Sequence, residues 1–104
     1  MLIDILGTKY AVKEDTSLND TRADGLCKCY SKEILYRNPN DMLCKDDPRE
    51  LKEERKREVL RHEIIHAFFH EAGLSDYSSD EVLVDWIAVQ FPKMLGAMEQ
   101  AGGI

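Results

Sequence analysis

The first third of the chain alternates apolar and polar side chains, which is the pattern of half-buried β-strands. Residues 2–13 alternate on both sides of Gly7, so they predict a first hairpin or one bent strand. A polar stretch over residues 14–24 follows, and residues 26–37 predict a second hairpin. We therefore expect a small N-terminal antiparallel sheet.

The pattern changes to that of a helix near residue 48. Asp47 followed by Pro48 is a suitable start, since a carboxylate can cap the first N–H groups and proline fits the first helical position. No helix-breaking residue follows until Gly73, which stands where a left-handed residue commonly ends a helix. We expect one long helix over residues 48–72, or two helices that break near Lys56.

A second helix is expected over residues 79–91, after a loop at residues 74–77. Pro92 should halt or kink this helix, and residues 93–101 should add a turn or two. Five apolar residues of this helix are expected in the core, and so is Trp86 unless its ring is exposed. These five are Val82, Val84, Ile87, Val89 and Phe91. The order of the elements indicates an α+β fold in which the sheet packs on the long helix and on a C-terminal helix.

Length and composition restrict the function. A chain of 104 residues has room for a single domain, residues 1–104. Its formal net charge of −6 argues against nucleic acid as a partner. The chain begins without the basic region of a signal peptide, and no segment reaches the length of a membrane span. Cys27, Cys29 and Cys44 make an odd number of thiols, so we expect reduced cysteines and a cytoplasmic protein.

One pentapeptide in the long helix has side chains that could bind a metal ion and take part in catalysis. His62-Glu63-Ile64-Ile65-His66 has the H-E-x-x-H arrangement of zinc metallopeptidases. Residues four apart lie on the same face of a helix, so both imidazoles can bind one zinc ion while Glu63 stands beside it. The alternative is a pair of histidines that are hydrogen-bonded or half-exposed without metal. Zinc also needs a third protein ligand and an open position for water.

His70 is the nearest further histidine in the sequence, but its position excludes it as that ligand. It lies eight residues after His62, or about 12 Å along a helix axis, whereas ligand atoms lie about 2 Å from the ion. The simplest interpretation is a cation near the helix C-terminus beside Glu71. A role behind the ligands, or facing the substrate, is the alternative.

Glu81 is the better candidate for the third ligand. It shares a helix face with Asp85, and the short connection after Gly73 allows the second helix to fold back over the two histidines. Glu81 would then complete the zinc site, and Asp85 would accept the free ring N–H of one histidine. In the alternative interpretation, residues 78–81 form a capping box in which Glu81 only closes the helix start.

The motif with its downstream acids resembles the gluzincin pattern of zinc peptidases. Over residues 60–92 the chain resembles small phage and prophage proteins related to the ImmA/IrrE-like metallopeptidases. The resemblance implies a minimal zincin-like domain with His62, His66 and Glu81 as zinc ligands and Glu63 as general base. Known members include peptidases that cleave repressors of mobile elements. In related enzymes the substrate lies along an edge strand, which residues 33–37 are expected to offer here.

The expected function is a zinc metalloendopeptidase acting on a peptide or a cytoplasmic regulatory protein. His70, Tyr77 or a hairpin tyrosine are candidates to stabilise the oxyanion. One competing function is a non-catalytic zinc-binding module of phage origin that blocks a host protein, with His70 or Cys44 as a fourth ligand. Another is an interaction protein without metal.

Cys27-Lys28-Cys29 has one residue between its two cysteines, which is one fewer than the usual spacing of a zinc knuckle. We therefore interpret these thiols as edge-strand residues that share a face.

Overall fold

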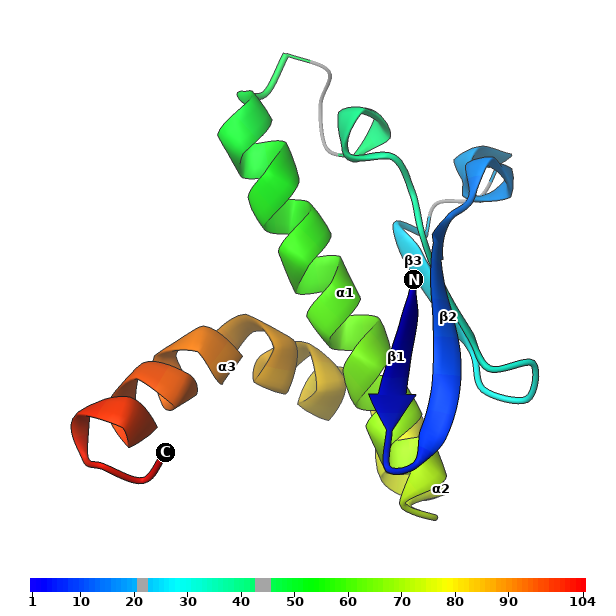
Figure 1. Ribbon diagram of the computed structural model, residues 1–104. Coiled ribbons are helices and arrows are strands. Elements are labelled where there is room, and N and C mark those ends of the chain that lie inside the picture. The colour runs from blue at the N-terminus through cyan, green and yellow to red at the C-terminus, as the bar shows by residue number, and fades with distance from the viewer. Residues whose placement is uncertain (21–22, 43–45) are drawn as a thin grey trace.

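The computed structural model describes residues 1–20, 23–42 and 46–104 and has an α+β architecture (Figure 1). Within these residues a four-stranded sheet lies beside a long helix, and a second long helix leaves from the far end of the first. The strands are β1 (Leu2–Ile5), β2 (Thr8–Glu14), β3 (Gly25–Lys28) and β4 (Glu33–Tyr36). The helices are α1 (Arg49–Glu71), α2 (Ser75–Ser78) and α3 (Glu81–Gln100), with short 3-10 turns η1 (Thr16–Asp20) and η2 (Pro39–Asp41).

The sheet is mixed, so the expectation of an antiparallel sheet was wrong at one pairing. Both predicted hairpins form, β1 with β2 and β3 with β4, but the strand order is β1-β2-β4-β3 and β2 pairs with β4 in parallel. The alternation of side chains shows which residues face the core, but it does not show the direction in which two hairpins join.

This strand order moves the free edge of the sheet. The predicted edge segment, residues 33–37, falls on β4, which is hydrogen-bonded to β2 on one side and to β3 on the other. That expectation was wrong, and the edge on this side is β3. β3 contacts α1, and its residues Gly25, Leu26 and Cys27 line the same cavity as His62 and His66.

The core lies between the sheet and α1. Tyr10 and Ile34 from the sheet and Ala67 from the helix are fully buried in one cluster with Ile5 and Val12. The helix is continuous, as one of the two alternatives predicted, and Gly73 ends it with a φ of 77°. Pro48 lies one residue before the helix, as its N-cap residue, and not in its first turn.

α3 runs through Pro92 instead of stopping there. A proline in a helix cannot donate to the carbonyl four residues earlier, which is the carbonyl of Ala88. Arg61 of α1 fills this gap, because its Nε donates to that oxygen over 2.6 Å. Of the two predicted outcomes at Pro92, the halt was therefore wrong, since the contact between α1 and α3 replaces the missing bond. The predicted loop at residues 74–77 was also wrong, as most of it belongs to α2.

α3 buries only one narrow face. Val84 and Ala88 are inaccessible to solvent, and Ile87 is half-buried. Val82, Val89 and Phe91 are exposed, so their assignment to the core was wrong, and Trp86, which is 56% exposed, also lies outside the core. Figure 1 shows the reason: the helix crosses α1 near its own start and then extends away from the sheet. In the described part of the chain, no helix combines the length and apolarity that a membrane span needs.

Candidate metal centre

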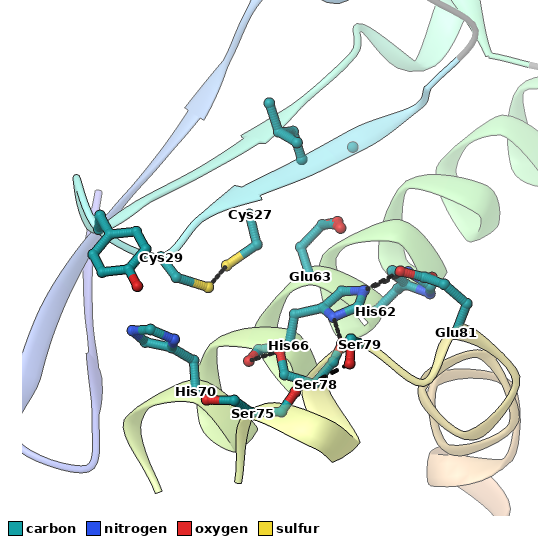
Figure 2. Close-up of a pocket in the computed structure, with 13 residues that line it drawn as sticks. Cys27, Cys29, His62, Glu63, His66, His70, Ser75, Ser78, Ser79 and Glu81 are labelled. Atoms are coloured by element: carbon teal, nitrogen blue, oxygen red, sulfur yellow. Dashed lines mark hydrogen bonds and ion pairs between the residues drawn. The ribbon is translucent and has the colours of Figure 1, made fainter. Parts of the chain in front are cut away.

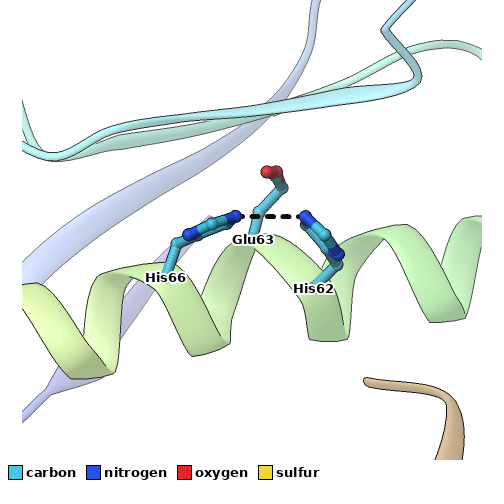
Figure 3. A group of neighbouring side chains, drawn as sticks. All are labelled: His62, Glu63 and His66. Atoms are coloured by element: carbon cyan, nitrogen blue, oxygen red, sulfur yellow. Dashed lines mark hydrogen bonds between the residues drawn. The ribbon is translucent and has the colours of Figure 1, made fainter. Parts of the chain in front are cut away.

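α1 sets two imidazoles one helical turn apart and facing each other (Figure 3). The rings of His62 and His66 have centroids 4.7 Å apart, and their Nε2 atoms are 3.1 Å apart. This geometry is local, because a spacing of four residues stacks side chains on one helix face.

The start of α3 brings Glu81 to the same point. Its two carboxylate oxygens lie 3.1 Å from the Nε2 of His62 and 3.2 Å from the Nε2 of His66. The expected fold-back of the second helix is therefore present. Asp80 is the residue that caps α3, accepting the N–H of Leu83 over 3.1 Å. The capping-box interpretation of Glu81 was wrong, since this carboxylate points away from the helix start and toward the histidines.

The other ring nitrogens are held by acceptors. The Nδ1 of His62 lies 2.9 Å from a carboxylate oxygen of Asp85, and the Nδ1 of His66 lies 2.6 Å from the carbonyl oxygen of Ser78. An ionised carboxylate and a carbonyl can only accept, so each Nδ1 must carry the hydrogen. In a neutral imidazole the Nε2 then presents a lone pair. Asp85 thus occupies the position expected for it.

Three groups of lone pairs therefore converge on one point. Two donors bound to a tetrahedral zinc ion at about 2.0–2.1 Å are about 3.3–3.4 Å apart, close to the separations of 3.1 and 3.2 Å found here. Without a cation between them, whether proton or metal, these groups repel each other. His62, His66 and Glu81 therefore present three acceptors at spacings that could hold a metal ion. We call these three residues the donor triangle.

Glu63 lies beside this triangle and differs from its members in being buried, only 6% exposed, and without a hydrogen-bond partner at Oε2. Burial raises the pKa of this carboxyl to about 7, against the attraction of His62, and the nearby Glu81 and Asp85 raise it further. Glu63 also lies within 4.8 Å of the imidazole donors and could itself hold a metal. Glu81 is nearer to both imidazoles, at 3.1 and 3.2 Å.

Two cavities meet at the centre. The larger, of about 550 Å³, lies between β3 and the histidines and includes Cys27, Cys29 and His70 in its wall (Figure 2). The smaller, of about 210 Å³, opens on the other side of His62 and Glu63. Gly25, His62 and Glu63 line both cavities, so the two cavities lie on opposite sides of Glu63.

His70 lines the larger cavity but stays outside the donor triangle, as its position on the helix predicted. Its ring lies edge-on to Tyr30, with centroids 5.5 Å apart. Glu71, its expected anionic neighbour, pairs with Lys32 over 2.9 Å. Tyr77 packs against Phe69 and does not line this cavity, whereas Tyr30 does. Cys44 lies outside the described residues.

Sequence reasoning missed two contributors. Ser78 clamps α2 to α1, because its hydroxyl donates to the carbonyl of His66 over 3.0 Å while its own carbonyl orients that ring. A backbone carbonyl leaves no signal in a sequence. Gly25 lets β3 approach α1 closely, since a Cβ there would lie 3.0 Å from the Cγ of Glu63. A glycine within a strand pattern can indicate such an approach.

Comparisons with known proteins add no further information on this chain. Neither the models of protein families, nor the curated proteins, nor the solved structures contain a match to it.

Proposed function

We propose that this chain is a zinc-dependent metallopeptidase of the gluzincin type, in which His62, His66 and Glu81 hold the ion. The observation that carries the proposal is the convergence of three acceptors, separated by 3.1–3.2 Å, on one point. Asp85 and the Ser78 carbonyl fix both ring tautomers so that the lone pairs face that point.

Glu63 supplies the acid–base chemistry in this proposal. Zinc in such a site provides Lewis acidity, which activates water and polarises a carbonyl oxygen. The unpartnered Oε2 of Glu63 accepts the proton of the attacking water and later delivers it to the leaving amine. In the metal-free protein the pKa of this group is raised to about 7, and a bound cation would lower it, which favours the ionised form that accepts the proton.

The shape of the site supports a peptide as the substrate. Cavities on both sides of Glu63 leave room for a chain that continues in both directions, as an endopeptidase requires. The edge strand β3 borders the larger cavity through Gly25, Leu26 and Cys27. An extended peptide can pair with the free backbone groups of such an edge. By its resemblance to the ImmA/IrrE-like peptidases, the chain would cleave a regulatory protein in the cytoplasm.

Glu63 also separates this proposal from a zinc-holding interaction module. A zinc ion that only stabilises structure needs its ligands and no free carboxylate beside them. Burying a carboxylate without a partner costs folding free energy, so its retention favours a catalytic role.

The test combines metal analysis with hydrolysis of an unstructured protein, such as casein, followed by mass spectrometry. We expect one zinc ion per chain. Glu63→Gln should keep the ion and lose about 10²–10⁴-fold of the activity, as is typical when a general base is removed. Glu54→Gln makes the same change at an exposed position of α1 and should leave activity unchanged. A protein that takes up no zinc, or a Glu63→Gln variant as active as the wild type, would disprove the proposal.

A further inference from the structure

Two thiols lie in the wall of the larger cavity, across from α1 (Figure 2). Cys27 belongs to the edge strand β3, and Cys29 is the first residue of the turn that follows it. Their sulfur atoms are 3.4 Å apart, and both side chains are partly exposed. The proposed hydrolysis does not use either residue.

The separation of the sulfurs suits a shared metal ion better than a disulfide. Two thiolates at about 2.3 Å from one tetrahedral ion are about 3.8 Å apart, which is close to the observed 3.4 Å. A disulfide would require the sulfurs to approach to about 2.05 Å and the Cβ atoms to within about 3.5–4.5 Å. The sulfur atoms, 3.4 Å apart, are not bonded to each other, and both cysteines are free thiols.

Two carboxylates near the pair would attract a cation. Burial raises the pKa of the Cys27 thiol, and so do the hydrogen bond with Cys29 and the carboxylates of Glu63 and Glu71. Positive charge placed at the sulfurs would be attracted by the same carboxylates. His70 lines the same cavity and contacts Tyr30, the residue after Cys29, so its imidazole lies on the same side of the sheet as the thiols.

We propose that Cys27 and Cys29 bind a second, thiophilic divalent ion, such as zinc or cadmium, with His70 as a third donor. Binding deprotonates both thiols, so two protons are released for each ion bound. An ion at this place would occupy the cavity beside Glu63 and obstruct a peptide lying along β3. This inhibitory consequence rests on the proposed peptidase function, whereas the binding site itself does not.

The binding test uses cadmium alone, added to the reduced, metal-free protein. A cadmium–thiolate bond gives a charge-transfer absorption in the ultraviolet, so the titration reports the sulfur site and not the histidines. We expect one thiolate-bound ion per chain. Cys27→Ser and Cys29→Ser should each weaken binding about 100-fold or more, beyond the 10–100-fold typical for loss of an outer partner of a ligand. His70→Gln should weaken it to a smaller extent.

Two controls separate this site from the donor triangle. Cys44→Ser removes the third thiol of the chain and should leave the absorption unchanged. Glu81→Gln weakens the proposed catalytic site and should also leave it unchanged, so the thiol site is tested even if the protein hydrolyses nothing. Thermal melting without cadmium checks that each variant is folded.

The proposal is overturned if the absorption is absent, or if it persists unchanged in Cys27→Ser and Cys29→Ser. It is also overturned if the protein purified under reducing conditions has lost two hydrogens through a disulfide between these cysteines. For the inhibitory part, zinc beyond one equivalent should inhibit casein hydrolysis by the wild type and not by Cys27→Ser. Equal inhibition of both would refute that part.

Discussion

Gly25→Ala provides a sharp test of how β3 and α1 pack at the site. A Cβ at this position would lie 2.6 Å from the Cγ1 of Val59 and 3.0 Å from the Cγ of Glu63. Real Cβ contacts essentially never fall below 3.0 Å, so either the strand or the helix must move. Val59 is 5% exposed and, as a β-branched residue in a helix, has one strongly preferred rotamer, so it cannot swing aside.

The size of the effect follows from two opposing terms. Forcing a methyl group into a packed site costs about 1–3 kcal/mol. Alanine in place of glycine also restricts the unfolded chain, which returns about 0.4–1 kcal/mol. The free energy of unfolding should therefore fall by up to about 2.6 kcal/mol. For a domain of this size, each kcal/mol lowers the melting temperature by about 4–8 °C.

The assay is urea and thermal unfolding of the metal-free protein, followed by zinc titration. Gly96→Ala is the matched control, since a Cβ there meets nothing within 4 Å and the residue lies within α3. This control should be stabilised by about 0.5–1 kcal/mol, because alanine is the better helix former. Zinc affinity should stay near that of the wild type in both variants, as neither contacts the donor triangle.

A Gly25→Ala protein as stable as Gly96→Ala would show that β3 does not approach α1 in this way. A stable variant with unchanged hydrolysis would further show that the position of Glu63 does not depend on this contact.

Three further predictions concern the charges of the site. Burial raises the pKa of Glu63 from 4.5 to about 7, so the metal-free protein should lose stability as the pH rises from 4.5 to 7. At pH 8 the Glu63→Gln variant should be more stable than the wild type by up to about 3 kcal/mol. Equal stabilities of the two proteins at pH 8 would contradict this prediction. Asp85→Asn should weaken zinc binding about 10–100-fold, as measured by dialysis. Ser78→Ala keeps the carbonyl that contacts His66 but loses the hydroxyl bond to His66, so it should weaken binding less, and equal losses would refute the roles assigned to these residues. Zinc at 100 times its dissociation constant should stabilise the wild type by about 2.7 kcal/mol and should not stabilise His66→Gln. If a chelator added to the zinc-loaded wild type leaves its melting temperature unchanged, the protein does not bind the metal.

The elements formed by neighbouring residues could be predicted well. Alternation gave both hairpins, and the absence of breakers up to Gly73 gave the long helix. Errors appeared where a partner from elsewhere in the chain intervened. Pro92 does not end α3, because Arg61 supplies the donor that proline lacks. Val89 and Phe91 are exposed, because only one face of α3 meets α1.

The sequence by itself determined the pair of imidazoles, since a spacing of four residues on a helix brings His62 and His66 together through local geometry alone. It also indicated Glu81 and Asp85, because the glycine that ends α1 makes a fold-back possible. Only the tertiary structure decided the rest of the site. The Ser78 carbonyl on His66, the free edge of β3 and the two thiols facing the cavity all depend on contacts between segments far apart in the sequence. Such contacts are set by packing and strand pairing, which no local pattern encodes.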